Sequence, residues 1–361
     1  MNIKDIENFL AENGHKPYRL KEIKKAVFVD LATSWQDIKF LPKDLRDSLD
    51  EKFAFSCLKN IKTLESKKGD SVKVVFETSD GLKIETVLMK HLATGSEQVV
   101  GRNTVCISSQ AGCAMACGFC ATGKAGYKRN LASEEIVEQV LFFARYLKSE
   151  NHQGESLISR TPLDGRIDGR NAIDNIVFMG MGEPFLNYDN VMEAARILND
   201  KDGFNLGIRH ISISTCGITP AIKKFAEEKL QINLAVSLHG ANDEIRTKLM
   251  PINKVYPIAA LMTAIDNYIK KTNRKVMFEY LLIDGVNDSR EDAYELAKLM
   301  KGHLYHVNLI KYHDTGGTYK PSLKAKRDVF FDTLKKLGVS VTQRVSFGED
   351  ILAACGQLAG E

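Results

Sequence analysis

Four cysteines lie within fifteen consecutive residues of this chain, at Cys106, Cys113, Cys117 and Cys120. The last three form the spacing C-x3-C-x2-C, with Phe119 directly before the final cysteine. Such short spacings allow three thiolates of one loop to converge on a single inorganic centre, and thiolate-rich ligation suits an iron–sulfur cluster or zinc. Zinc would need a fourth ligand from elsewhere. A four-iron cluster held by three cysteines keeps one iron open for another molecule.

The bulk composition is that of an ordinary globular chain. Its 361 residues, 44% hydrophobic and 27% charged, suffice for one large catalytic domain and a smaller attachment. The longest apolar runs are only as long as strands, so we expect no membrane association. The opening stretch MNIKDIENFLAENGHKPYRL has no signal-peptide core, so we expect a cytoplasmic protein, where clustered cysteines more often bind metal or act in catalysis. The net charge of +4 permits nucleic-acid binding without indicating it.

The chain up to about residue 65 has the pattern of a small helical unit. Apolar residues recur at helical spacing over residues 3–13 and 19–28. A third helix is indicated over residues 41–53, where Pro42 lies near the helix start. Lysines on the outer face of the second helix suit either RNA phosphates or an ordinary solvated surface.

Residues 72–89 predict a hairpin. Two runs of alternating polarity flank the sequence Ser-Asp-Gly at 79–81, which favours a tight turn. Glu85 lies on the second expected strand, where an acidic residue is usually a solvent-facing side chain. We therefore expect an accessory domain over residues 1–90 and a catalytic domain over residues 91–361.

From residue 104 onward, strands alternate with helices, which indicates parallel βα units. The expected strands occupy residues 105–107, 175–182, 210–217, 232–240, 276–285, 304–313 and 339–348. A helix is expected to open at Ser133, an N-cap residue followed by acidic side chains. The polar stretch 148–172 lacks periodicity and indicates a surface insertion. Such a repeat forms either a doubly wound sheet or a barrel.

Polar or catalytically useful residues follow four of these strands. They are Gly182, Glu183, Ser214, Ser237, Leu238, His239 and His313. Both candidate folds place chemistry in the loops after the carboxyl ends of strands. The convergence of several independent strand ends is therefore a stronger indication of a site than any single residue.

Several motifs together resemble one enzyme family. They are CISSQAGC leading into C-x3-C-x2-C, CATGKAGYKRNL, FMGMGEPFLN, SISTCG, VSLH, KLMPIN, EYLLIDGVND, HVNLI and GEDILAACGQL. With these motifs most of the chain resembles the RlmN/Cfr family of radical S-adenosylmethionine (SAM) RNA adenosine methyltransferases, and within it the RlmN branch. The resemblance implies an α/β fold, a partial six-unit (β/α) barrel behind a small N-terminal helical accessory domain that binds RNA.

The resemblance also implies a reaction. The expected product is adenosine methylated at C2, at position 2503 of 23S rRNA and, in some members, also at position 37 of tRNA. Cys113, Cys117 and Cys120 correspond to ligands of a [4Fe-4S] cluster whose open iron chelates SAM. An electron donor such as flavodoxin or ferredoxin is implied, and we expect a monomer.

Three further residues match catalytic positions of the family. Cys355 corresponds to a thiol that takes a methyl group from one SAM, while a second SAM supplies the radical that attaches this carbon to C2. Two SAM molecules are thus consumed per turnover. Cys106 corresponds to the thiol that releases the product by forming a disulfide with Cys355, and Glu85 to the residue proposed for the C2 proton. On residue type alone, a buried strand cysteine is the favoured interpretation of Cys106.

The SAM positions of the family correspond to the strand-end residues. These are Gly182, Glu183, Ser214, Ser237, Leu238, His239 and His313. One departure stands out, because the family usually reads N-L-I-x-x-N where this chain ends in His313. Histidine is larger than asparagine and titrates near neutral pH.

Alternatives remain at this point. A Cfr-type enzyme would methylate C8 of the same adenosine, and a non-catalytic paralogue would bind RNA only. A zinc or electron-transfer module would never use SAM. Lys124, Lys128 and Arg129 suit either phosphate binding or ordinary solubility, and Cys57 and Cys216 suit packing.

Overall fold

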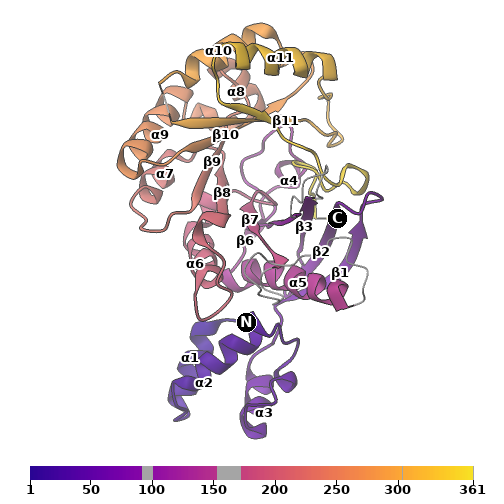
Figure 1. The fold of residues 1–361 in the computed structure, drawn as a ribbon, viewed down its shortest axis with the longest axis vertical. Helices are drawn as coiled ribbons and strands as arrows, with labels where there is room; N and C mark the ends of the chain where they lie inside the picture. The colour runs from indigo at the N-terminus through magenta and orange to yellow at the C-terminus, as the bar shows by residue number, and fades with distance from the viewer. Residues whose placement is uncertain (92–100, 153–171, 303, 361) are drawn as a thin grey trace.

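The computed structural model describes residues 1–91, 101–152, 172–302 and 304–360. Figure 1 shows an N-terminal helical unit at one end, antiparallel strands on one side, and parallel strands flanked by helices in the rest of the body. No helix in these ranges is both long and apolar enough to cross a membrane.

The helical unit consists of α1 (Ile3–Glu12), α2 (Tyr18–Lys24) with its π-helical continuation η1 (Lys25–Val29), η2 (Trp35–Asp37) and α3 (Lys43–Lys52). The three expected helices are confirmed. The apolar face of α1 is buried as its spacing predicts. Trp35 is fully buried, and its indole donates a hydrogen bond to the Phe53 carbonyl at 2.7 Å.

The prediction that helical structure extends to about residue 65 is wrong. Residues Leu58–Glu65 form β1, an edge strand that pairs with β2 (Ser71–Thr78) in antiparallel register. Apolar residues at 58, 61 and 64 have helical spacing, but the register shifts between Asn60 and Lys62 and breaks strand alternation. An exposed edge strand has no buried face to impose a period of two.

The predicted hairpin is confirmed as β2 and β3 (Lys83–His91), which pair in antiparallel register. The turn closes with hydrogen bonds between Thr78 and the Leu82 carbonyl, and Gly81 takes a positive φ. β3 pairs in turn with β4 (Arg102–Cys106), so the hairpin and the catalytic strands share one sheet.

The parallel part of the sheet contains all seven expected strands. After β4 they are β7 (Asn175–Phe178), β8 (Ile211–Thr215), β9 (Asn233–Ser237), β10 (Val276–Leu282), β11 (Tyr305–Lys311) and β12 (Val341–Gln343). Each pairs with the next in parallel register. Among the described residues the edge strands β1 and β12 do not pair with each other, so the barrel is partial, as expected.

Helices cover the outer side of this curved sheet (Figure 1). They are α5 (Ser133–His152), α6 (Tyr188–Asn199), α7 (Thr219–Phe225), α8 (Asp243–Leu249), α9 (Ile258–Thr272), α10 (Arg290–Met300) and α11 (Lys324–Lys336). Tyr280 of β10 stacks on Phe330 of α11 with ring centroids 5.5 Å apart, one of many contacts that bury the sheet face. Each such fully buried side chain stabilises the folded state by roughly 1.5–3 kcal/mol relative to an exposed one.

The expected insertion at 148–172 begins later than predicted. α5 continues to His152, so the first five residues of that stretch are helical. Most of the remainder lies outside the described residues.

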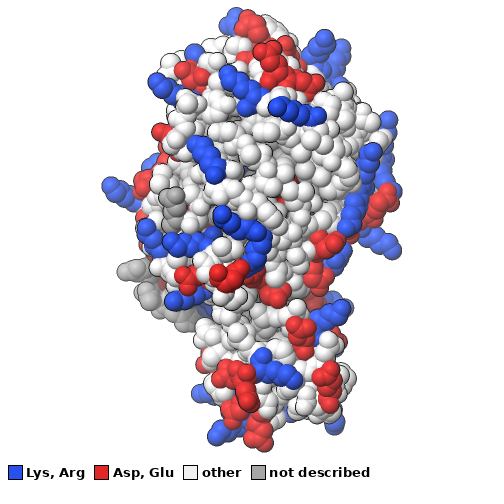
Figure 2. Space-filling model, turned by 180° about the vertical axis from the view of Figure 1, so that it is seen from behind, with Lys and Arg blue, Asp and Glu red and all other residues white. Residues whose placement is uncertain are grey.

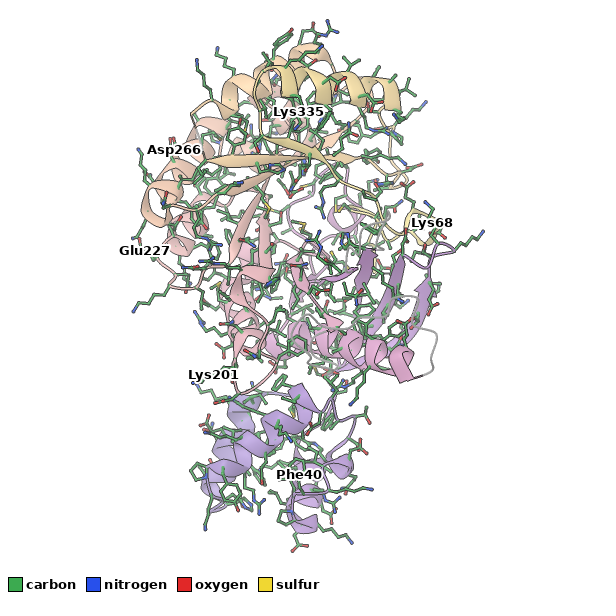
Figure 3. All side chains as sticks on the ribbon, viewed as in Figure 1. Phe40, Lys68, Lys201, Glu227, Asp266 and Lys335 are labelled. Atoms are coloured by element: carbon green, nitrogen blue, oxygen red, sulfur yellow. The ribbon has the colours of Figure 1, made fainter. Side chains whose placement is uncertain are left out.

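Charges are spread over the surface. On the face seen in Figure 2, Lys and Arg side chains alternate with Asp and Glu along the rims, around a broad uncharged area. Lys68, in the turn between β1 and β2, extends away from the body (Figure 3). The net charge of +4 is thus not gathered into one patch on this face.

Candidate active site

One cavity lies at the carboxyl ends of the parallel strands and gathers most of the predicted site residues. Its walls include Cys106, Cys113, Cys117, Cys120, Gly182, Glu183, Ser214, Ser237, His239, His313 and Cys355. These residues come from β4, the cysteine loop, the loops after β7, β8, β9 and β11, and the C-terminal segment. Glu85 and Leu238 do not line the cavity, and both are buried behind its wall.

The cysteine loop is held by backbone contacts on several sides. Cys113 donates its N–H to the Gly126 carbonyl at 3.2 Å, and Gly118 donates to the Leu249 carbonyl at 3.0 Å. Gly112 has φ +74°, and a Cβ there would lie 1.8 Å from the Gly126 oxygen, so only glycine permits this approach. A two-stranded ladder of β5 (Gln110–Ala111) and β6 (Arg129–Asn130) closes the base of the loop.

The three loop cysteines are free thiols facing the same cavity. Burial raises the pKa of Cys113 to about 12 and that of Cys117 well above its ordinary value. A metal that binds them must therefore displace their protons. In the described part of the chain, no group of three or more His, Cys, Asp or Glu is arranged to hold a metal ion.

The donor set nevertheless fits an iron–sulfur cluster. Three soft thiolates come from one short loop beside an open cavity, which is the ligand chemistry of such clusters. The same cavity extends from the loop cysteines to Glu183, Ser214 and Ser237, which would leave space for a further molecule beside the cluster.

The C-terminal segment packs directly against the cysteine loop at α4 (Ala121–Lys124). Ala121 donates its N–H to the Gly356 carbonyl at 2.7 Å, and the Thr122 hydroxyl donates to the Leu358 carbonyl at 2.5 Å. These bonds hold Cys355 at the cavity wall. Although Cys355 is exposed to the cavity, the surrounding protein desolvates its thiol and raises its pKa.

Cys106 lies across the same cavity on β4. Its register places it opposite Val87 of β3 and Val177 of β7, both of which also line the cavity. Burial raises the pKa of Cys106 to about 12, and the Cys355 charge adds to this effect. Arg344 lowers the pKa of both thiols, so its guanidinium lies near both. Two thiols of one cavity thus share a neighbouring cation.

Glu85 of β3 is held by Lys73 of β2 and by Ala359 of the C-terminal segment. Its Oε1 is 3.2 Å from the Lys73 ammonium, an ion pair in which both side chains are almost fully buried. Its Oε2 accepts a hydrogen bond from the Ala359 N–H at 3.0 Å. The end of the C-terminal segment therefore covers the Glu85 carboxylate and separates it from the cavity.

Glu183 organises the loops after β7 and β8. One carboxylate oxygen accepts from the Phe185 N–H at 3.0 Å, and the other from the Cys216 N–H at 2.7 Å. Burial raises its pKa, while these donors act in the opposite direction. Because a carboxylate offers about four lone-pair sites, Glu183 can still accept a hydrogen bond from a ligand in the cavity. Gly182 has φ +101°, and a Cβ there would lie 2.6 Å from Gln110 Cβ.

His239 is a fixed, neutral side chain. Its Nδ1 accepts a hydrogen bond from the Leu281 N–H at 3.1 Å, which assigns the ring proton to Nε2. Burial lowers its pKa to about 3. The ring packs edge-on against Phe119, the residue before the last loop cysteine, with centroids 4.8 Å apart. His239 thereby connects the loop after β9 to the cysteine loop.

His313 occupies the position where the family pattern has asparagine. Its Nε2 lies 2.9 Å from the Ser346 hydroxyl, and its Nδ1 lies 3.8 Å from Glu349. Burial lowers its pKa, and Glu349 opposes this effect. Both ring nitrogens face protein groups, so His313 links β11 to the C-terminal segment as well as lining the cavity.

The structure also locates Arg129, Cys216 and Lys124. The Arg129 guanidinium is bound by Asp80 and Glu135 through hydrogen bonds of 2.7–2.8 Å, so it braces the hairpin turn against α5 and is not available for phosphate. Cys216 is buried in the apolar core, as expected of a packing residue, and it also lines the cavity near the cysteine loop. Lys124 donates to the Thr315 carbonyl at 2.9 Å.

Two charged cavity residues escaped sequence reasoning. Glu279 of β10 and Arg344, just beyond β12, both line the cavity and lie 3.4 Å apart. Asn308 also donates to Glu279 at 2.9 Å. A charged residue within the apolar run VMFEYLL was the available signal, because a buried strand rarely keeps an unpaired carboxylate.

Comparison with known proteins places this geometry in context. The profile of the Radical SAM superfamily matches residues 166–297, a range that follows the cysteine loop. A protein of Spiroplasma citri named a probable dual-specificity RNA methyltransferase RlmN is 43% identical over 98% of this chain and 94% of its own length. A ribosomal RNA large subunit methyltransferase N of Nitrosopumilus maritimus is 42% identical over 98% of this chain and 95% of its own length.

A solved structure agrees over the whole chain. The crystal structure of a radical SAM methyltransferase from Sphaerobacter thermophilus superposes with a TM-score of 0.89 at 40% identity. The match covers all of this chain and 98% of that protein.

Proposed function

The chain belongs to the RlmN family of radical SAM RNA methyltransferases, and we propose that it methylates C2 of adenosine 2503 in 23S rRNA. Relatives that carry the name dual-specificity RNA methyltransferase support a second substrate, which we take to be adenosine 37 of tRNA. We further propose that the enzyme is a cytoplasmic monomer and receives electrons from a flavodoxin or ferredoxin.

The observation that carries the proposal is the meeting of five cysteines, besides Cys216, in one cavity. Three come from the cysteine loop, one from β4 and one from the C-terminal segment, 235 residues beyond the last loop cysteine. A cluster ligand set needs only the first three. The other two supply what carbon methylation through a protein thiol requires, namely a carrier and a thiol that releases the product.

Cys113, Cys117 and Cys120 would hold a [4Fe-4S] cluster, and Glu183, Ser214, Ser237 and His239 surround the space for SAM. Together the cluster and two SAM molecules would supply a methyl group and the radical chemistry that an electron-poor aromatic carbon demands. Neutral His239 keeps the cysteine loop in place through Phe119.

Cys355 then acts as the methyl carrier. Its thiol loses a proton and takes the methyl carbon, and Arg344 favours the thiolate it needs. One hydrogen atom is removed from this methyl group before its carbon bonds to C2. When the C2 proton and one electron, which the iron–sulfur group would accept, have also left, the Cys106 thiolate attacks the Cys355 sulfur. The sulfur–carbon bond breaks, its carbon takes up a proton to complete the methyl group, and the methylated base leaves. A Cys106–Cys355 disulfide forms, which an external dithiol must reduce.

Glu85 is the proposed acceptor of the C2 proton. In this structure Ala359 covers its carboxylate and Lys73 holds it from the opposite side. Proton transfer therefore requires the C-terminal segment to shift away from β3 while Cys355 stays with the base. Such a shift needs only a few hydrogen bonds to break.

The experiment is methylation of 23S rRNA fragments and of tRNA by anaerobically reconstituted enzyme, followed by digestion and mass spectrometry of the nucleosides. We expect 2-methyladenosine. The Cys57→Ala variant is the matched control, because Cys57 lies outside the cavity. 8-Methyladenosine would assign the chain to Cfr-type chemistry instead, and an unmethylated product would contradict the proposal.

A further inference from the structure

Arg246 is a fully buried arginine of α8 with an incomplete set of partners. Its Nη1 donates to Asn253 Oδ1 at 2.7 Å and its Nη2 donates to the Cys216 carbonyl at 2.6 Å. Its Nε finds no hydrogen-bond partner within the described residues. Both partners are uncharged, which leaves the guanidinium charge without direct compensation.

No carboxylate contacts Arg246 directly among the described residues; Asp243 is connected to it through Asn253. Across the described ranges, no Asp or Glu forms an ion pair with it. Asp243 is reached only through Asn253, whose Nδ2 donates to Asp243 Oδ1 at 2.8 Å. A buried charge without an ion-pair partner is costly, and such charges are normally paired or hydrogen-bonded to an anion. The arrangement therefore points to a negatively charged group that the protein itself does not contain.

The cysteine loop is the neighbour on which this charge acts. One turn along α8, the Leu249 carbonyl accepts the Gly118 N–H at 3.0 Å, which fixes the helix to the loop. Although burial raises the pKa of the Cys117 thiol, the Arg246 charge acts on it in the opposite direction. Arg246 thus lies close enough to the loop to stabilise negative charge there.

The surrounding backbone is shaped to admit this side chain. A Cβ on Gly217, after β8, would lie 3.2 Å from Nη2, and a Cβ on Gly240, after β9, would lie 2.8 Å from the Arg246 nitrogen. Two strand-end loops therefore close around Arg246 because glycine stands at both positions. The backbone of these two loops therefore forms a fitted space for the guanidinium beside the cysteine loop.

We propose that Arg246 is a positioning residue whose buried positive charge offsets the negative charge of the loop thiolates and their iron–sulfur group, and thereby raises the reduction potential of that group. The proposal rests on the cluster assignment and not on which base is methylated. Reduction adds one negative charge beside the loop. A fixed cation in a site of low dielectric favours the reduced form, and nearby charge is one of the factors that set such potentials.

The test is a redox titration of the reconstituted protein without RNA or SAM, followed by electron paramagnetic resonance, with iron and sulfide quantified. The variants are Arg246→Gln, which removes the charge, and Arg246→Lys, which keeps it. Arg209→Gln is the control, because Arg209 is exposed in the 3-10 turn Ile208–His210 that precedes β8. We expect Arg246→Gln to lower the midpoint potential by at least about 59 mV, a tenfold change in the ratio of reduced to oxidised protein. Arg246→Lys should retain most of the wild-type potential, and Arg209→Gln all of it.

A second variant tests the charge with a side chain of the same shape. Asp243→Asn keeps an acceptor for Asn253 and Ile258 while removing a negative charge, so it should raise the potential. Unchanged potentials in Arg246→Gln and Asp243→Asn at equal iron content would overturn the proposal. So would loss of iron in both Arg246 variants, because charge would then not be the feature that matters. A failed RNA methylation assay with a normal potential would instead overturn the proposed function alone.

Discussion

Replacing Cys106 by alanine separates the two roles that its cavity position permits. As a packing residue, Cys106 loses only one buried sulfur, because the β-carbon stays in place and the side chain is already 8% exposed. A void of this size lowers the free energy of unfolding by about 1 kcal/mol. For a chain of this length, that change lowers the melting temperature by about 2–4 °C or less. The protein should therefore remain folded and keep its cluster ligands.

As the releasing thiol, Cys106 has a far larger effect on turnover. Carbon–carbon bond formation through Cys355 does not need it, but cleavage of the bond between Cys355 and the base does. We expect Cys106→Ala to accumulate protein covalently joined to RNA, up to one RNA per chain, with less than one product per enzyme.

The assay is denaturing electrophoresis of an anaerobic reaction with labelled RNA, with the adduct located by mass spectrometry of nuclease-treated protein. Cys57→Ala is the matched cysteine control and should run free of RNA. If Cys106→Ala ran free of RNA and still turned over many times, the releasing role would be refuted. A melting temperature that fell far more than a single sulfur allows would mean that packing dominates instead.

Three further outcomes are expected. Cys355→Ala should keep wild-type iron content yet yield no methylated nucleoside by mass spectrometry, and retained product would remove the carrier role. Arg129→Met should lower the free energy of unfolding by roughly 2–4 kcal/mol in a denaturant titration, because buried Glu135 loses its cationic partner. A decrease below about 0.5 kcal/mol, the usual limit for a surface substitution, would contradict this prediction. His239 has a folded pKa of about 3, below its unfolded value near 6.5, so the unfolded state binds the extra proton and stability falls as pH falls below about 6.5. Between pH 7 and pH 5 this histidine should account for about 2 kcal/mol of the loss, which His239→Gln should abolish in urea titrations at the two pH values.

The part of the fold that repeats was predictable from sequence. Each strand from β7 to β11 contains buried apolar residues at regular spacing, so these strands stand out in the sequence whatever they pack against. Their carboxyl ends meet at one edge, which is why Glu183, Ser214 and His239 reach one cavity. β1 was missed because an exposed edge strand carries no such pattern.

The role of a residue that depends on a partner far away in the chain could not be predicted from the neighbouring sequence. Arg129 resembles a loop cation until Asp80, 49 residues away, is found to bind it. The role of Glu279 and Arg344 becomes visible only from the ion pair that they form between β10 and the residue after β12. The hydrogen bond from Ala359 to Glu85 connects residues that are 274 positions apart, and no local sequence spacing predicts it.

The most direct test of the central claim follows the methyl group itself. Anaerobic turnover with SAM bearing a trideuterated methyl group, followed by mass spectrometry of the adenosine, reports both the site and the route of transfer. Passage through Cys355 as proposed removes one deuterium before the carbon reaches the base, so the account predicts 2-methyladenosine that carries two deuterium atoms. A product that retains all three, or a methyl group on another ring position, would contradict it.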